Sequence, residues 1–153
     1  MTISLDRTDQ KILDIMSSDA RISMTELARK VSLSKTPVMA RLKRLEEQGV
    51  IQGYAAQVDP VRLGLDHVAF VEVKLTDSRE KALAAFNSAV AGVPEIEECH
   101  MIAGAFDYLL KVRTSDMTRY RIVLGERISS LPHVAHTATH VAMQAVKDGG
   151  FVT

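Results

Sequence analysis

Residues 95–111 have the sequence EIEECHMIAGAFDYLLK, which is typical of a β-hairpin. The part from Glu95 to Ala103 is strand-like, and the small residues Gly104 and Ala105 then offer a tight turn. A second strand is expected from Asp107 to Arg113. Because a short turn joins antiparallel neighbours, this part of the chain is predicted to lie in an antiparallel sheet.

The segments on both sides of the hairpin complete a βαββαβ order. From His67 apolar and polar residues alternate, as in a half-buried strand. A helix capped by Ser78 follows, a second helix capped by Ser115 comes after the hairpin, and a last strand covers roughly His136 to Val146. This order predicts a ferredoxin-like domain of the α+β class, with both helices on one face of the sheet.

The other face of that sheet also needs a cover. A second copy of the sheet is the simplest one, and such a dimer has the two-fold symmetry that a palindromic DNA site requires. Each half of a chain of 153 residues is also too small for a large core. We therefore expect a homo-oligomer.

The N-terminal third of the chain predicts two short helices. Asp6 fits the N-cap of the first, which ends near Asp19. Ser23 and Glu26 have the spacing of a capping box, in which the hydroxyl and the carboxylate each accept a hydrogen bond from a backbone amide. Apolar residues recur at helical spacing in both segments, so each helix has a side to bury.

A third helix follows a tight break at Ser32–Ser34. It begins with Ser34 or Thr36 as its cap and with Pro37 in its first turn, where the missing N–H does no harm. Val50 to Val58 is then strand-like and is expected to form a wing. The pattern is typical of a winged helix-turn-helix; an ordinary three-helix packing domain is the alternative.

The outward face of the third helix has the composition of a DNA-recognition surface. It is small near its start and basic further along, so the helix can approach base edges while Lys and Arg bind phosphates. The predicted DNA-binding residues are Ser34, Lys35, Thr36, Pro37, Ala40, Arg41, Lys43 and Arg44. Among them, Arg41, Lys43 and Arg44 are expected mainly to bind the phosphate backbone. The residues expected to meet base edges are Ser34, Lys35, Thr36 and Ala40.

The charge of the chain is unevenly distributed. Its formal net charge is zero, which by itself counts against nucleic-acid binding, because phosphate contacts supply most of the non-specific affinity. Between Arg21 and Arg44, however, there are seven basic residues and one acidic residue, Glu26. This local excess favours DNA binding over a merely solvated charged face.

The sequence also indicates where the protein works. A lone Cys99 excludes an internal disulfide and suits a reducing compartment. No stretch resembles a signal peptide or a membrane span. We therefore expect a cytoplasmic protein with no membrane contact.

Cys99, His100 and the later histidines raise the question of a metal or a catalytic site. Neighbouring strand residues point to opposite faces, so Cys99 and His100 cannot easily bind one ion. His136 and His140 share a strand face but are too far apart in an extended segment. No metal site is therefore expected. Because no acid, base and nucleophile cluster emerges either, the chain is not expected to be an enzyme.

The chain resembles the leucine-responsive regulatory protein/AsnC family of bacterial transcription regulators. The resemblance extends from Leu5 to Lys147 and is carried by residues 5–7 (LDR), 41–54 (RLKRLEEQGVIQGY) and above all 95–111. It implies a winged helix-turn-helix, dimers that associate into tetramers or octamers, and an amino acid bound between dimers near a Gly-x-x-Asp turn. Within the family, residues 33–38 (LSKTPV) and the C-terminal half are most similar to proline-utilisation activators of proteobacteria.

The resemblance also assigns the effector site by position. The effector-binding residues that it implies are Met101, Gly104, Asp107, Met117, Thr139 and His140. A zwitterionic ligand suits the turn chemically, because a glycine lets backbone amides approach a carboxylate and Asp107 can accept from an ammonium group. At His140 and Ala142 the leucine-responsive protein has larger residues, so the effector is expected to be leucine, proline or a similar amino acid. No other cofactor is expected.

Two domains and one function follow from these observations. Residues 1–58 are expected to bind double-stranded DNA, with a linker strand at about 50–66, and residues 67–153 to bind the effector and assemble the oligomer. The predicted function is regulation of amino-acid metabolism genes by activation or repression. The alternatives are an amino-acid-binding subunit that regulates an enzyme through protein contacts, and a small ferredoxin-like enzyme.

Overall fold

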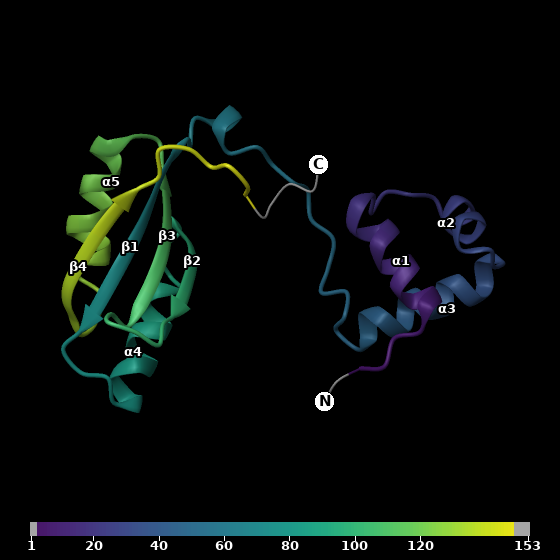
Figure 1. The fold of residues 1–153 in the computed structure, drawn as a ribbon, viewed down its shortest axis with the longest axis horizontal. Coiled ribbons are helices and arrows are strands. Elements are labelled where there is room, and N and C mark those ends of the chain that lie inside the picture. Colours follow the sequence, from purple (N-terminus) through teal and green to yellow (C-terminus); the bar gives the residue numbers. More distant parts are fainter. Residues whose placement is uncertain (1–2, 149–153) are drawn as a thin grey trace. The chain divides into compact units, whose positions relative to one another are not determined.

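The computed structural model describes residues 3–148, which form two compact units (Figure 1). The first unit ends at Gln57 and is helical, and the second comprises Val58–Asp148 and contains the sheet. The predicted end of the second domain, at residue 153, lies outside the described residues.

The first unit is built from α1 (Arg7–Ser18), α2 (Met24–Val31) and α3 (Lys35–Glu47). These helices share one hydrophobic core. Its buried members are Ile12, Leu27, Ala28, Val31, Val38, Leu42 and Leu45. Since all three helices contribute to it, the core holds α3 in place from its inner side.

The starts of the first two helices differ in how far they follow the capping pattern. At α1 the capping box is complete, because Asp6 and Asp9 each accept a hydrogen bond from the other's backbone amide. At α2 the Ser23 hydroxyl accepts from the amide of Glu26 at 3.1 Å, as predicted. The reciprocal bond predicted for Glu26 is wrong, because its carboxylate is taken by Arg29.

A tight turn joins α2 to α3. Ser32 adopts a left-handed conformation with φ of 59°, which reverses the chain in few residues. Ser34 then occupies the N-cap position of α3 without a side-chain hydrogen bond. At the other end α3 stops at Gln48, and Gly49 takes a φ of 70°, the conformation that favours glycine after a helix.

The predicted wing strand at Val50 to Val58 is wrong for this chain. Within the described part of the first unit the segment after Ile51 is irregular and no strand forms. The physical reason is the lack of a partner, because a strand is stable only when a neighbour accepts its backbone hydrogen bonds.

The second unit has the predicted ferredoxin-like topology. In chain order it contains the 3₁₀ turn η1 (Val61–Leu63), β1 (His67–Leu75), α4 (Glu80–Val90), β2 (Ile96–Met101), β3 (Tyr108–Thr114), α5 (Met117–Val123) with the π-helical turn η2 (Leu124–Ile128), and β4 (Val134–Val141). The strands are antiparallel in the order β2-β3-β1-β4. Figure 1 shows α4 and α5 beside this sheet.

The core of the second unit lies between the sheet and its two helices. Ala69, Val71 and Val73 alternate along β1 and are fully buried. They pack with Phe86 of α4 and Tyr120 of α5, so both helices cover the same face, as the period-two pattern predicted. Among the described residues no helix is long and apolar enough to cross a membrane.

Three predicted boundaries in the second unit are wrong. The N-cap of α4 is Arg79 instead of Ser78, because Asp77 pairs with Arg79 and accepts its amide. The N-cap of α5 is Asp116 instead of Ser115, since the Asp116 carboxylate accepts from a helical amide. The last strand ends at Val141 instead of Val146, near the point where its partner β1 begins.

Candidate nucleic-acid interface and effector site

The outer stripe of α3 carries the residues expected to meet DNA. Thr36, Ala40 and Lys43 are exposed and follow one another at helical spacing. Met39, which sequence reasoning missed, is also 56 % exposed on this helix. Its signal was its position beside the core residue Val38, which places it off the buried stripe. An exposed Met suits contact with a thymine methyl group.

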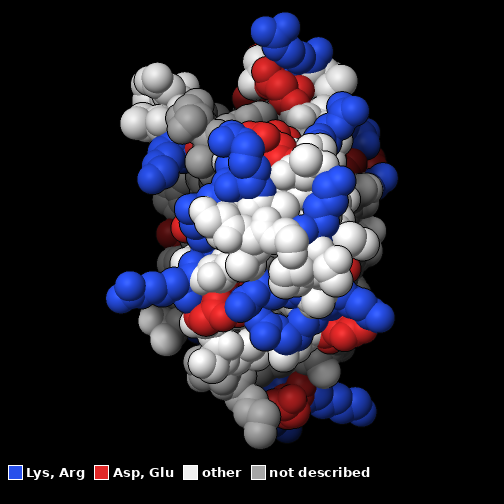
Figure 2. Space-filling view, turned by 90° about the vertical axis from the view of Figure 1, so that its right-hand side faces the viewer, with Lys and Arg blue, Asp and Glu red and all other residues white. Residues whose placement is uncertain are grey.

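Three further basic side chains of the first unit are exposed. They are Lys35 at the start of α3, Lys30 in α2 and Arg21 before α2. Within residues 3–148 no ion pair is recorded for any of the three. Figure 2 shows a face of the molecule on which Lys and Arg lie around an area of uncharged surface. Such an arrangement fits phosphate contacts around a base-reading surface.

Arg41 and Arg44 form ion pairs within the first unit. Arg41 Nη1 donates to Asp9 Oδ1 at 2.7 Å and to Asp6 Oδ2 at 2.6 Å, and Arg44 Nη2 donates to Asp9 Oδ2 at 2.5 Å. Asp9 is only 1 % exposed. The amide of Asp9 and the guanidinium of Arg41 lower the pKa of Asp6. Sequence reasoning placed both arginines among the phosphate contacts and did not foresee this acidic partner.

The β2–β3 turn carries the predicted Gly104 and Asp107. The Asp107 carboxylate accepts from the amide of Leu75 at 2.7 Å and from Lys74 Nζ at 3.2 Å. These two donors, the amide first, lower the pKa of Asp107. An added Cβ at Gly104 meets only Ile102 Cγ2 at 3.5 Å, an ordinary contact, so the backbone itself does not require glycine there.

The turn also offers donors to a ligand. Ile102 donates to the carbonyl of Asp107 at 2.9 Å and so closes the hairpin. Within the described chain, no backbone acceptor is recorded for the amides of residues 103–106. A turn with free amides is a suitable anion site for a ligand carboxylate.

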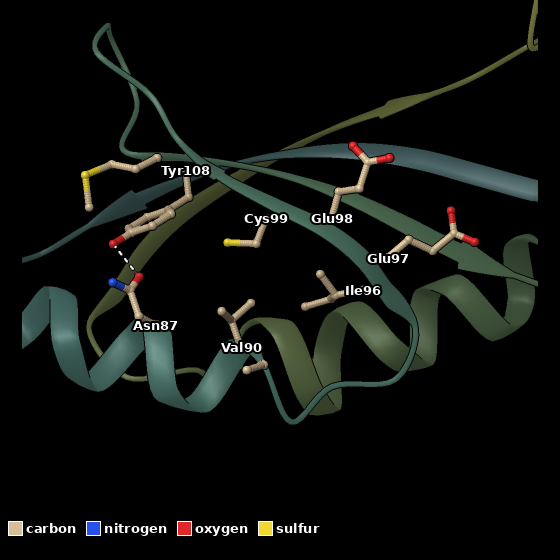
Figure 3. A pocket seen from close by; sticks show the side chains of 9 residues that line it. Asn87, Val90, Ile96, Glu97, Glu98, Cys99 and Tyr108 are labelled. Atoms are coloured by element: carbon tan, nitrogen blue, oxygen red, sulfur yellow. Dashed lines mark hydrogen bonds between the residues drawn. The ribbon is translucent and has the colours of Figure 1, made fainter. Parts of the chain in front are cut away.

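A hollow of about 580 Å³ lies between α4 and the edge strand β2 (Figure 3). Its walls include Val90, Ile96, Cys99, Met101 and Tyr108. In Figure 3 the Cys99 side chain lies between α4 and β2, and the Tyr108 hydroxyl donates to Asn87 Oδ1 at 2.7 Å. Burial raises the pKa of the Cys99 thiol, so this group stays neutral. Asn87, Glu97 and Glu98 also line the hollow, so it combines an apolar wall with polar groups; Met101 and Tyr108 connect it to the two ends of the turn.

The remaining predicted effector residues lie elsewhere in this chain. Met117 begins α5 after the far end of β3, so the length of that strand separates it from Gly104. The Thr139 hydroxyl bonds Tyr120 Oη at 2.5 Å on the helix side of the sheet. His140 is paired with Glu72 at 3.1 Å on the open side. A single chain therefore brings together Met101, Gly104 and Asp107 only.

The open face of the sheet combines exposed apolar groups with buried charge. Phe70 is 37 % exposed and lies opposite Lys111 in the register. Lys111 and Arg113 are largely buried beside Glu97, which a bulge in β2 brings to this side. A face of this composition is suited to a partner that buries apolar groups around satisfied ion pairs.

The thiol and imidazole of Cys99 and His100 point to opposite sides. Cys99 pairs with Leu110, a core position, and His100 with Leu109 on the open face. Among residues 3–148 no group of three or more His, Cys, Asp or Glu side chains is placed to hold a metal ion.

Family comparisons match both units. A winged helix-turn-helix DNA-binding family matches residues 5–52, and the Lrp/AsnC ligand binding domain matches residues 68–151. These two matches together cover nearly all of the described chain.

Three similar proteins illustrate the likeness. The proline dehydrogenase transcriptional activator of Rhizobium radiobacter is 60 % identical over 149 residues, which are 97 % of this chain and 96 % of that protein. The leucine-responsive regulatory protein of Klebsiella pneumoniae is 48 % identical over 94 % of this chain and 87 % of its own. The crystal structure of a transcriptional regulator of Neisseria meningitidis in complex with L-methionine has a TM-score of 0.88 at 30 % identity, covering 95 % of this chain and 94 % of that one.

Proposed function

The chain belongs to the Lrp/AsnC family of DNA-binding transcription regulators, and we propose that it activates a proline dehydrogenase gene when proline binds to its C-terminal unit. The observation that carries this proposal is the 60 % identity, over 97 % of the chain, to a proline dehydrogenase transcriptional activator. The leucine-responsive relative is more distant, at 48 %. Proline is therefore the first effector to test and leucine the second.

DNA binding is assigned to the first unit, with α3 in the major groove. Thr36, Met39 and Ala40 meet base edges, because they are exposed, uncharged and close to the start of the helix. Lys35 and Lys43 bind phosphates beside them. Ser34 and Pro37 set the start of the helix at the groove, the first as its N-cap and the second in its first turn.

Effector binding is assigned to the hairpin turn and the hollow beside it. The free amides of residues 103–106 receive the carboxylate, and the apolar wall near Met101 receives the side chain. Asp107 braces the turn through Leu75 and has room for one further donor such as a ligand ammonium. Met117, Thr139 and His140 reach the ligand only from a neighbouring chain, so the complete site forms between subunits.

Assembly is assigned to the open face of the sheet. A second copy that covers Phe70 and Leu109 gives a two-fold dimer, which matches a palindromic site in double-stranded DNA. Dimers then associate into tetramers or octamers and bring the effector residues of neighbouring chains together. A regulator of this kind works on promoter DNA in the bacterial cytoplasm, as part of the nucleoid.

A thermal-shift screen against the proteinogenic amino acids tests the effector assignment. We expect proline to raise the melting temperature selectively, since a ligand at about 100 times its Kd stabilises the folded state by roughly 2.7 kcal/mol. Gly104→Val, which places a branched side chain where the ligand carboxylate would approach the turn amides, should abolish the shift. Gly125→Val, at a position with open space around an added Cβ, should keep it. A selective shift by another amino acid, or a shift that survives Gly104→Val, contradicts the proposal.

A further inference from the structure

The first unit contains a compact cluster of two carboxylates and two guanidinium groups. Asp9 stands at its centre and receives Arg41 on one oxygen and Arg44 on the other. The amide of Asp6 reaches the second oxygen as well, at 3.2 Å. The buried carboxylate of Asp9 thus accepts from three donors, and the cluster as a whole has no net charge.

The cluster connects α1 to the recognition helix α3. Asp9 lies in the first turn of α1, whereas Arg41 and Arg44 lie in successive turns of α3, on the border between its buried and its exposed side. Hydrophobic side chains allow small rotations of a helix, but charge-assisted hydrogen bonds have defined directions. Two such contacts one turn apart fix the rotation of α3 about its axis.

The two arginines differ in how much of each side chain remains available for a further contact. Arg41 gives one nitrogen to both carboxylates, and its side chain is 27 % exposed. Arg44 gives one nitrogen to Asp9 and is 45 % exposed. If Arg41 moved away to bind a phosphate, the buried carboxylate of Asp9 would lose one of its counter-ions, which is unfavourable. Arg44 can meet a phosphate with its outer edge and keep Asp9 with its inner edge.

We propose that Asp9 is a positioning residue for DNA recognition: it retains Arg41 as an internal counter-ion, fixes the rotation of α3, and presents the outer edge of Arg44 to the phosphate backbone. The inference rests on the proposed DNA-binding function of α3 and adds that Arg41, although basic and on the recognition helix, makes no phosphate contact. Base reading then depends on an acidic residue that never touches DNA.

The salt dependence of binding to a mixed-sequence duplex separates the two arginines. Each phosphate contact contributes about 0.9 to the slope of log affinity against log salt concentration. Arg44→Gln should lower the slope by about this amount per bound protomer, whereas Arg41→Gln should leave it unchanged. An equal loss of slope in both variants would overturn the inference. If the wild-type protein binds duplex DNA without salt dependence, the proposed function itself fails.

The positioning role of Asp9 is tested by measuring how strongly the protein prefers one DNA sequence over others. A preferred site is first selected by the wild-type protein from a random duplex pool, and its affinity is divided by that for the mixed-sequence duplex. Asp9→Asn should lower this ratio about tenfold, while the matched control Asp14→Asn, an exposed acid on the same helix, should keep it. An unchanged ratio in folded Asp9→Asn overturns the inference. If Asp9→Asn is unfolded by circular dichroism, Arg41→Lys, which retains the charge but not the fork of donors, takes its place and should also lower the ratio.

Discussion

Asp107 Oδ2 lies 2.7 Å from the backbone nitrogen of Leu75 and accepts its hydrogen bond, although 32 positions separate the two residues. The bond joins the start of β3 to the end of β1, and the carbonyl of Val73 accepts in return from the amide of Asp107 at 2.9 Å. Together these bonds fasten the β2–β3 turn to the central part of the sheet.

The Asp107 brace should make stability depend on pH. Because its folded-state pKa is lowered, Asp107 contributes stability that is fully present above the unfolded value of about 3.9 and is lost as the pH falls through the folded value. Asp107→Asn should therefore melt below the wild type at about pH 7, and the gap should narrow as the pH approaches 3. Thermal unfolding by circular dichroism measures the gap, and a constant gap would contradict the assigned cause.

Removing Asp9 should destabilise the first unit. Asp9→Ala takes away a buried carboxylate that binds two arginines, so Arg44 loses its partner and Arg41 keeps only Asp6. We expect a loss of about 2 kcal/mol, below the range for fully buried pairs because both arginines are partly exposed. Asp14→Ala, on the exposed side of α1, should cost less than about 0.5 kcal/mol. Urea unfolding compares the two, and equal losses would remove the special role of Asp9.

Thr36 and Lys43 should differ in how they affect DNA binding. Lys43 is exposed, and its contact with Glu47 at 3.7 Å is weak, so it is free to bind a phosphate. Lys43→Ala should weaken binding to all sequences alike and reduce the salt slope, whereas Thr36→Ala should change the preferred sequence. Fluorescence anisotropy with a panel of duplexes checks this. Uniform weakening by both variants would show that Thr36 does not read bases.

A charge on the open face of the sheet should disrupt assembly. Phe70→Glu places a carboxylate where we expect the second copy to pack, and an unpaired buried charge is costly. Analytical ultracentrifugation should then show a smaller species. Met143→Glu, at a fully exposed apolar residue, is the control and should leave the assembly intact. If Phe70→Glu sediments like the wild type, the oligomer uses another surface.

The topology was accessible from the sequence because it depends on local periodicity. The alternation around Val71 and the turn residues at Gly104 lie within short windows, and the sheet follows from their order. Errors arose where two neighbouring residues could each serve as the helix cap. Arg79 replaces Ser78 as a cap because of an ion pair with Asp77, a contact that no propensity encodes.

The candidate sites were less accessible, because their geometry depends on contacts between distant segments. Nothing in the spacing of Arg41 shows that Asp9, far away in the sequence, takes its charge. The same holds for residues 50–58, where the predicted strand is wrong because no partner strand pairs with them among the described residues. A sequence pattern indicates which secondary structure a segment favours, whereas contacts with other segments determine which structure it adopts.

The exposed stripe of α3 and its anchored edge have a consequence for how such regulators diverge. Thr36, Met39 and Ala40 are not part of the buried core, so we expect substitutions there to change promoter choice at little cost in stability. We therefore expect changes at these few positions to alter target choice, while the contacts of Asp9 with Arg41 and Arg44 hold α3 in the same orientation.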